Sequence, residues 1–190
     1  ISLMSEFIGL AYFAEIPLVL FNIQRGGPST GMPTRTQQSD LLICAYASHG
    51  DTKHILLFPV DPGECFTFGA DAFDLADRLQ TPVFVMSDLD IGMNDWVVDA
   101  LNWDDKRQAD RGKILDAETL QQVADFGRYR DVDGDGIPYR TIPGTHAEKG
   151  AFFTRGTSHT ETGGYTEDGI IHARNLDRIA EKHKTGVKLL

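Results

Sequence analysis

Residues 21–34 read FNIQRGGPSTGMPT, and this stretch decides the expected fold. An apolar run over 17–21 leads into it and predicts a β-strand that ends in a loop rich in glycine, proline and hydroxyl side chains. Glycine lets backbone amides approach a ligand closely, and the guanidinium of Arg25 suits a carboxylate or a phosphate. Because open parallel sheets bind ligands beyond the carboxyl ends of their strands, we expect this loop to border a binding site.

The composition indicates an acidic globular protein. The 190 residues are 41% hydrophobic and carry a net charge of −10, which argues against a general nucleic-acid-binding or membrane-surface role. Cys44 and Cys65 lie in apolar stretches without CxxC spacing, so we expect reduced thiols in a cytoplasmic protein. No apolar run reaches the length that spans a bilayer. Ile1 is not an initiator methionine, so we expect the chain to be part of a longer polypeptide.

Helix and strand patterns alternate over the first 90 residues. Apolar spacing and caps predict helices over 1–15, 36–46 and 61–80, and apolar runs predict strands over 17–23, 54–60 and 83–86. We expect the first helix to be mostly buried and the strand over 17–23 to be central, covered on both faces. Cys65, Phe66 and Phe73 are interpreted as core residues. The alternation predicts an α/β fold with a parallel sheet.

The pattern changes after about residue 90. Apolar periodicity fades, turn-forming residues dominate 127–169, and helices are predicted only over 116–126 and 170–184. A structureless stretch this long is unusual inside a compact domain. We therefore expect residues 91–190 to form an irregular arm that packs over the core or over a partner and leads to a further domain.

The acidic string DVDGDG at 131–136 is similar to the opening of a calcium loop. An EF-hand needs a bidentate glutamate at its twelfth position, where this chain has Ile142. A hydrophilic turn is favoured, and a calcium-dependent interaction module stays an alternative function. His146, His159 and Glu161 have no partner spacing that demands zinc, so they are interpreted as surface or network residues and no metal ligands are assigned.

Several strings match one known family. The most specific is RGGPSTG at 25–31, followed by PT at 33–34; the others are ISLMSE at 1–6, EIPLV at 15–19, QSDL at 38–41, TPVF at 81–84, IPG at 142–144 and HTE at 159–161. Together they resemble the α subunit of 2-oxoacid:ferredoxin oxidoreductases, and the nearest type is the 2-oxoglutarate enzyme. The resemblance is dense over 1–90 and looser over 91–190.

The resemblance implies a fold and an activity. Residues 1–90 would be the C-terminal part of a parallel-sheet, pyrimidine-type thiamine diphosphate-binding domain, N-terminally incomplete and followed by the extended arm over 91–190. The enzyme would decarboxylate a 2-oxoacid oxidatively, form an acyl-coenzyme A and pass electrons to ferredoxin. A β subunit would share the thiamine diphosphate and hold its Mg²⁺ and a [4Fe–4S] cluster, for which two cysteines in this chain are too few.

The resemblance also assigns site residues. Arg25 corresponds to the arginine that holds the substrate carboxylate and is the expected catalytic residue. The pocket wall would be formed by Gly26, Gly27, Pro28, Ser29, Thr30 and Gly31. The residues alone, apart from the resemblance, indicate that His49 either faces this pocket as an acid or base or is bonded locally in a turn.

Two features of the family are missing from these residues. Its substrate-recognition string and its cofactor-activating glutamate would lie before Ile1, so the chain alone is not expected to catalyse the reaction. Pyruvate or a branched-chain 2-oxoacid stays an alternative substrate to 2-oxoglutarate.

Overall fold

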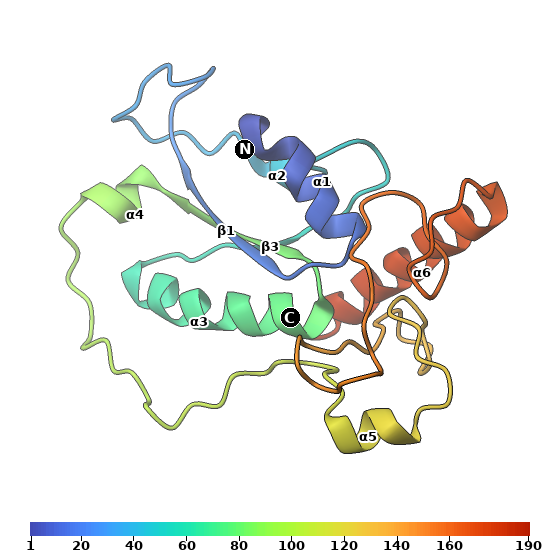
Figure 1. The fold of residues 1–190 in the computed structure, drawn as a ribbon. Helices are drawn as coiled ribbons and strands as arrows, with labels where there is room; N and C mark the ends of the chain where they lie inside the picture. The colour runs from blue at the N-terminus through green and yellow to red at the C-terminus, as the bar shows by residue number, and fades with distance from the viewer.

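The computed structural model describes residues 1–190 and contains a three-stranded parallel sheet with helices on both faces (Figure 1). The strands are β1 (Leu18–Gln24), β2 (Ile55–Leu57) and β3 (Pro82–Asp88), in the order β1-β3-β2. The helices are η1 (Ser2–Met4), α1 (Ser5–Phe13), α2 (Leu41–Ala45), α3 (Pro62–Leu79), α4 (Leu89–Met93), α5 (Ala117–Gln122) and α6 (Gly169–Val187). The predicted α/β fold with a parallel sheet is confirmed.

The two faces of the sheet carry separate apolar clusters. On one face, Ile8 of α1 and Cys44 of α2 pack with Phe84 of β3. On the other, the small residues Ala72 and Ala76 let α3 approach the strands closely. None of the helices combines the length and the hydropathy that a bilayer-spanning segment requires.

The central strand is β3, and the prediction that residues 17–23 form a central strand is wrong. Every residue of β3 is buried, whereas β1 forms an edge of the sheet and leaves Phe21 51% and Ile23 46% exposed. The first helix is also less buried than predicted, with Phe7 71% exposed. An apolar run shows that a strand can be buried, but the crossover connections decide which strand lies in the middle.

The helix start at Asp61 is confirmed in atomic detail. The Asp61 carboxylate accepts a hydrogen bond from the backbone N–H of Glu64 at 2.8 Å, and Pro62 occupies the first turn of α3. Phe73, expected in the core, is 58% exposed, because the alanines at 72 and 76 face the sheet instead. The helix predicted over 36–46 shortens to the single turn of α2.

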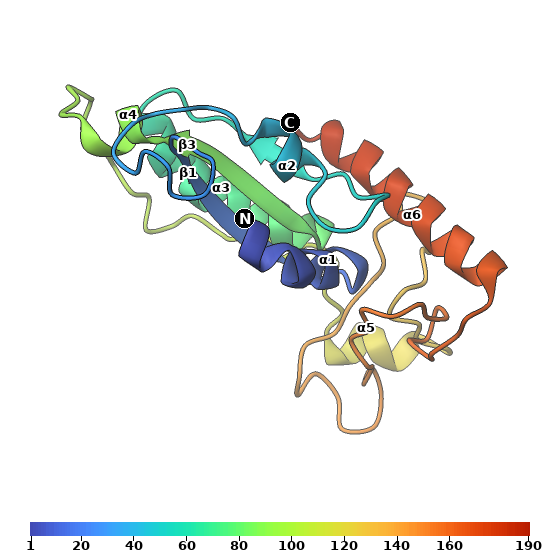
Figure 2. The same ribbon diagram turned by 90° about the horizontal axis from the view of Figure 1, so that it is seen from above.

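Residues 91–190 pack onto the same core as the first 90. Ile137 belongs to the apolar cluster between α3 and the sheet, and α6 packs against α3 and β2. Figure 2 shows α6 along one side of the molecule, beyond α1 and α2. The contact is tight at Gly186, where an added Cβ would lie 3.0 Å from side-chain atoms of Ile55 and Leu79. The helices predicted over 116–126 and 170–184 are confirmed as α5 and α6, and 127–168 hold no long element. The further domain expected beyond the arm stays a prediction.

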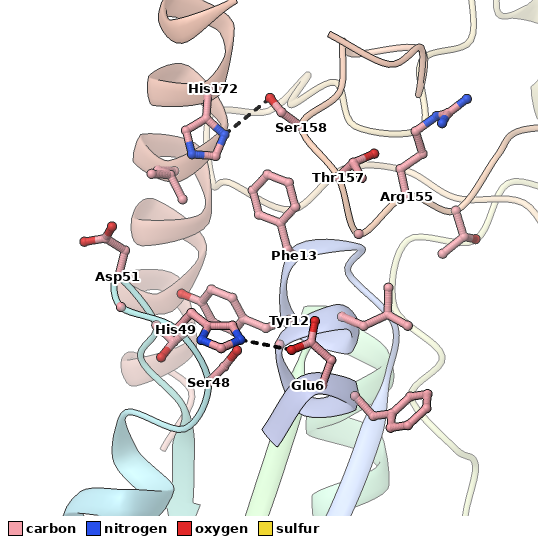
Figure 3. Close-up of a pocket in the computed structure, with 18 residues that line it drawn as sticks. Glu6, Tyr12, Phe13, Ser48, His49, Asp51, Arg155, Thr157, Ser158 and His172 are labelled. Atoms are coloured by element: carbon pink, nitrogen blue, oxygen red, sulfur yellow. Dashed lines mark hydrogen bonds and ion pairs between the residues drawn. The ribbon is translucent and has the colours of Figure 1, made fainter. Parts of the chain in front are cut away.

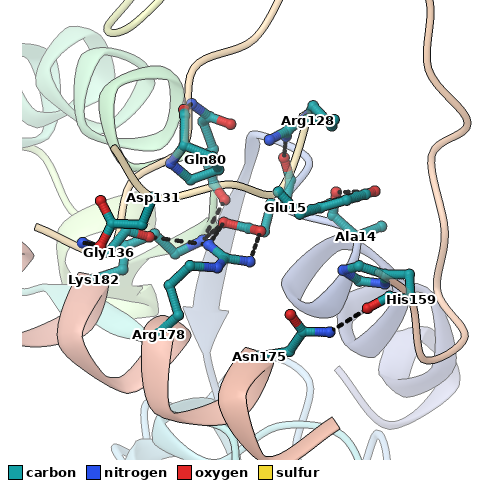
Figure 4. Close-up of polar contacts among 12 residues, drawn as sticks. Ala14, Glu15, Gln80, Arg128, Asp131, Gly136, His159, Asn175, Arg178 and Lys182 are labelled. Atoms are coloured by element: carbon teal, nitrogen blue, oxygen red, sulfur yellow. Dashed lines mark hydrogen bonds and ion pairs between the residues drawn. The ribbon is translucent and has the colours of Figure 1, made fainter. Parts of the chain in front are cut away.

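A buried carboxylate joins these parts (Figure 4). Glu15, just beyond α1, is 1% exposed and has a left-handed backbone with φ of 56°. Its carboxylate accepts hydrogen bonds from Arg178 Nη1 at 3.0 Å and from Lys182 Nζ at 2.8 Å, both on α6. Lys182 also donates to the carbonyl of Gln80 at the end of α3, and Arg128 Nη2 donates to the carbonyl of Glu15 at 2.8 Å. The four segments therefore meet at one charged cluster.

The cluster shifts the pKa values of its members. Burial alone would raise the pKa of Glu15, but Lys182, Arg178 and Arg128 outweigh it and lower the pKa to about 2. Burial lowers the pKa of Lys182 to about 8, although Glu15 opposes this shift. The carboxylate of Glu15 is the negative charge that these three buried cations share. Without it, the cations would be buried with no counter-charge.

Replacement of Glu15 by glutamine should destabilise the fold strongly. Glu15→Gln keeps the shape but leaves buried cations without a counter-charge, a change that costs about 3–5 kcal/mol in comparable buried pairs. Urea unfolding followed by circular dichroism measures the loss. Glu181→Gln is the matched control, because Glu181 pairs with Lys184 at the surface of the same helix and its loss should leave the midpoint unchanged. Equal midpoints for the two variants would show that the buried cluster contributes nothing.

Acid should destabilise the wild-type protein more than Glu15→Gln. The pKa of Glu15 is about 2 in the folded state against an ordinary value of 4.5, so the stabilisation is fully present above pH 4.5 and is lost as the pH falls towards 2. The shift corresponds to about 3 kcal/mol. Unfolding free energies measured from pH 6 downwards should converge for the two proteins, and parallel curves would contradict the assignment.

Candidate functional site

A cleft of about 700 Å³ lies at the carboxyl ends of β1 and β3. Gln24 ends β1 and Asp88 ends β3, and both side chains line the cleft. The remaining lining comes from the loop before α2, the end of β3, the segment after β2 and the region of α4: Gln38, Leu41, Phe58, Pro59, Val60, Met86, Asp90, Ile91 and Trp96. This is the edge at which the sequence predicts a binding site.

The polar side chains of the cleft are fixed by hydrogen bonds. Gln38 Nε2 donates to Asp88 Oδ2 at 2.6 Å, while Asp88 Oδ1 accepts from the backbone of Ile91 and caps α4. Gln24 Nε2 donates to the carbonyl of Ser87 at 3.4 Å, and its Oε1 accepts from the backbone N–H of Asp40. The cleft therefore presents carboxylate and amide groups in defined orientations.

The loop after β1 is closed by its own backbone. Gly26 N–H donates to the carbonyl of Arg35 at 2.8 Å, and Met32 N–H donates to the carbonyl of Gly26 at 2.9 Å. A Cβ on Gly26 would lie 2.9 Å from the Cβ of Met32, and one on Gly31 would lie 2.5 Å from the carbonyl oxygen of Gly27. Glycine is thus required at both positions by close packing of the loop on itself.

Arg25 lies just beyond the carboxyl end of β1, outside the lining of the cleft and without a partner in this chain. It follows Gln24 directly, its side chain is exposed, and it makes no hydrogen bond or ion pair with another residue. Residues 26–31 also stand outside the lining of the cleft, and most of them are exposed. The guanidinium is free to meet an anion, and the roles of Arg25 and of the loop stay predictions.

His49 lies elsewhere, in a second cleft of about 630 Å³ (Figure 3). This cleft is bounded by α1, residues 48–52, residues 154–158 and α6, and no residue of the glycine–proline loop lines it. His49 Nε2 lies 2.9 Å from Glu6 Oε2 at the surface. Because His49 precedes β2, the chain places it towards the amino end of that strand, away from Gln24. The structure therefore does not bring His49 and Arg25 into one pocket.

The second cleft also holds a residue pair that the sequence did not indicate. His172 Nδ1 lies 3.3 Å from Ser158 Oγ, and the two face the end of α1 (Figure 3). Fourteen residues separate them, on α6 and on an irregular segment, so no local spacing could reveal the contact. Each imidazole of this cleft already has a polar neighbour in the chain.

The acidic turn at 131–136 is bound to a lysine. Lys113 Nζ lies 2.7 Å from Asp133 Oδ2 and 2.8 Å from Asp135 Oδ1. The Asp131 carboxylate accepts from the backbone N–H groups of Asp133, Gly134 and Gly136. No group of three or more histidine, cysteine or carboxylate residues is arranged to hold a metal ion. The geometry favours the hydrophilic turn over the calcium loop.

The chain matches known proteins over most of its length. Residues 1–126 match the family described as pyruvate flavodoxin/ferredoxin oxidoreductase, thiamine diP-binding. The 2-oxoglutarate synthase subunit KorA of Methanothermobacter thermautotrophicus is 48% identical over 91 residues, which are 48% of this chain and 24% of that protein. Subunit alpha of 2-oxoacid:ferredoxin oxidoreductase 2 of Aeropyrum pernix is 39% identical over 184 residues, or 96% of this chain and 27% of that protein.

A solved structure shows the same fold. It is the 2-oxoglutarate:ferredoxin oxidoreductase from Magnetococcus marinus with 2-oxoglutarate, coenzyme A and succinyl-CoA bound. The two structures superpose with a TM-score of 0.77 at 28% sequence identity, and the match includes 100% of this chain and 32% of the Magnetococcus chain. The chain spans about a quarter of the length of the two curated relatives. With two thirds of its residues inside the family model, the chain belongs to the thiamine diphosphate-binding family of pyruvate flavodoxin/ferredoxin oxidoreductases.

Proposed function

We propose that this chain is a segment of the α subunit of a 2-oxoacid:ferredoxin oxidoreductase that oxidises 2-oxoglutarate to succinyl-coenzyme A. The observation that carries the proposal is the ordered cleft at the carboxyl ends of β1 and β3, with the RGGPSTG loop beginning directly after its Gln24. Relatives that match this chain include subunits named for 2-oxoglutarate and for 2-oxoacids in general.

The donor set of the cleft fits the pyrimidine half of thiamine diphosphate. Gln24, Gln38 and Asp88 offer hydrogen-bond donors and acceptors, and Phe58 and Trp96 offer apolar surface for a ring. Asp88 and Asp90 would repel a diphosphate, so that half of the cofactor, with its Mg²⁺, is assigned to the β subunit. When bound, the cofactor supplies the carbanion stabilisation that decarboxylation of a 2-oxoacid requires.

Arg25 is assigned to the substrate carboxylate. A guanidinium forms two parallel hydrogen bonds with a carboxylate, which fixes the orientation of the acid as well as its position. The rigid backbone of the loop over 26–31 limits the movement of Arg25, and the absence of a partner within the chain leaves both edges of the guanidinium available. The loop thus serves to orient the oxoacid beside the cofactor.

The reaction needs further components. Coenzyme A accepts the acyl unit, and the two electrons released pass through a [4Fe–4S] cluster on the β subunit to ferredoxin, in the cytoplasm. Pyruvate or a branched-chain 2-oxoacid is the alternative substrate, because the relatives aligned over 96% and 95% of this chain are named only for 2-oxoacids.

Removal of the Arg25 side chain should impair use of the substrate. In the complex of full-length α and β subunits, Arg25→Ala should lower kcat/KM for 2-oxoglutarate by about 100-fold, through the loss of a charge-assisted, bidentate contact. Arg25→Lys should recover part of the activity, because it keeps the charge but not the fork. The assay is reduction of an artificial electron acceptor that depends on 2-oxoglutarate and coenzyme A.

Arg35→Ala is the matched control, since Arg35 is the other guanidinium of the same loop. A loss confined to Arg25 supports a specific contact, and equal losses indicate a general effect of positive charge. Unchanged kcat/KM in Arg25→Ala rejects the assigned role. Parallel assays with pyruvate and a branched-chain 2-oxoacid test the substrate.

A further inference from the structure

An exposed apolar segment without secondary structure follows α4. Residues 94–103, called the strap from here on, form no helix or strand and leave α4 along the outside of the molecule (Figure 1). Five large apolar side chains in this short stretch are exposed, from 103% at Val97 and 55% at Trp103 to 51%, 43% and 41% at Leu101, Trp96 and Val98. Scattered apolar residues are ordinary on a surface, but a contiguous set of this kind marks an interaction site.

The backbone of the strap is also unpaired. No N–H group of residues 95–103 donates to another atom of the chain, and of their carbonyls only that of Ala100 accepts, from the nearby side chain of Asn102. An extended backbone with free hydrogen-bonding groups and exposed apolar side chains suits addition to another polypeptide.

The strap is nevertheless held in place at both ends. Trp96 Nε1 donates to the carbonyl of Asp90 at 3.0 Å, and the ring of Trp103 packs edge-on against Phe66 of α3 at 6.1 Å between centroids. Between the strap and the first turns of α3 runs a groove of about 750 Å³. The segment is thus presented as a fixed rim beside an open groove.

The position of the strap points to its occupant. Trp96 lines both this groove and the cleft at the carboxyl ends of the strands. Under the proposed function, the β subunit completes that cleft by holding the diphosphate half of the cofactor. A protein that covers this cleft therefore also contacts Trp96 of the strap.

The charge around the strap narrows the choice of partner. Residues 88–105 contain six aspartates and no lysine or arginine. A second copy of this chain, with a net charge of −10, is a poor match for such a surface. We infer that the strap docks the β subunit through an apolar surface rimmed by lysine and arginine; the inference rests on the proposed function, which requires that partner.

The test measures binding of purified β subunit to the full-length α subunit by sedimentation or titration. Val97→Asp should raise the Kd at least about tenfold, because it places a charge in a desolvated contact, while the thermal midpoint of the α subunit stays unchanged. Val132→Asp is the matched control: it adds the same charge at a valine that is 67% exposed in the acidic turn, and it should bind as wild type. Asp99→Lys should slow association and weaken its dependence on salt.

Other outcomes overturn the inference. Equal Kd values for wild type and Val97→Asp show that the strap does not dock the β subunit. A lower thermal midpoint in Val97→Asp alone shows that the α subunit covers its own strap, and loss of self-association in that variant shows that a second copy does. Failure of the proposed function is distinct: a complex that assembles through Val97 but does not oxidise any 2-oxoacid keeps the docking surface and rejects the reaction.

Discussion

The buried carboxylate of Glu15 is the interaction on which the arrangement of the chain depends. Arg178 and Lys182 from α6 donate hydrogen bonds to it, and the backbone carbonyl of Glu15 accepts one from Arg128 in the arm. Removing these charges from water is costly, and the cost is offset only when all the partners are in position. The cluster thus favours one arrangement of segments that lie more than 100 residues apart in the chain. Residues 91–190 are therefore bound into the core around the sheet, although they are largely irregular.

The charged cluster around Glu15 also positions the cleft at the carboxyl ends of β1 and β3. β1 begins at Leu18, three residues after Glu15, so the cluster fixes the strand that ends at Gln24 and continues into Arg25. The buried cations gather near the amino end of β1, whereas Asp88 and Asp90 lie at the carboxyl end of β3. This separation leaves the lining of the cleft with the carboxylates of Asp88 and Asp90 and no cation, while Arg25 stands just outside it. Under the proposed function, that distribution suits a neutral ring in the cleft and an acid group beside Arg25.

Local signals predicted local structure well. Asp61 and Pro62 marked the start of α3, and the apolar runs located all three strands, because caps and periodicity act over a few residues. Contacts between residues distant in the sequence were not predictable in this way. Lys113 binds Asp135, 22 residues away, and the central strand of the sheet is β3 rather than β1. For the site, the sequence placed Arg25 directly after the strand that ends at Gln24, and its role stays a prediction. The sequence could not show that Arg25 stands outside the lining of the cleft or that His49 lies in a different one.

The contrast between the two clefts favours the carboxyl edge as the functional one. In the second cleft, His49 is paired with Glu6, and His172 with Ser158, so its polar groups are largely satisfied within the chain. Near the carboxyl ends of the strands, Arg25 has no partner within the chain and the strap has an unpaired backbone. Along the lateral edge of the sheet, β1 leaves Phe21 and Ile23 exposed. Features that oppose stability in an isolated chain persist when a ligand or partner satisfies them. Under the proposed function, these features mark the side of the molecule at which substrate, cofactor and partner would meet the protein.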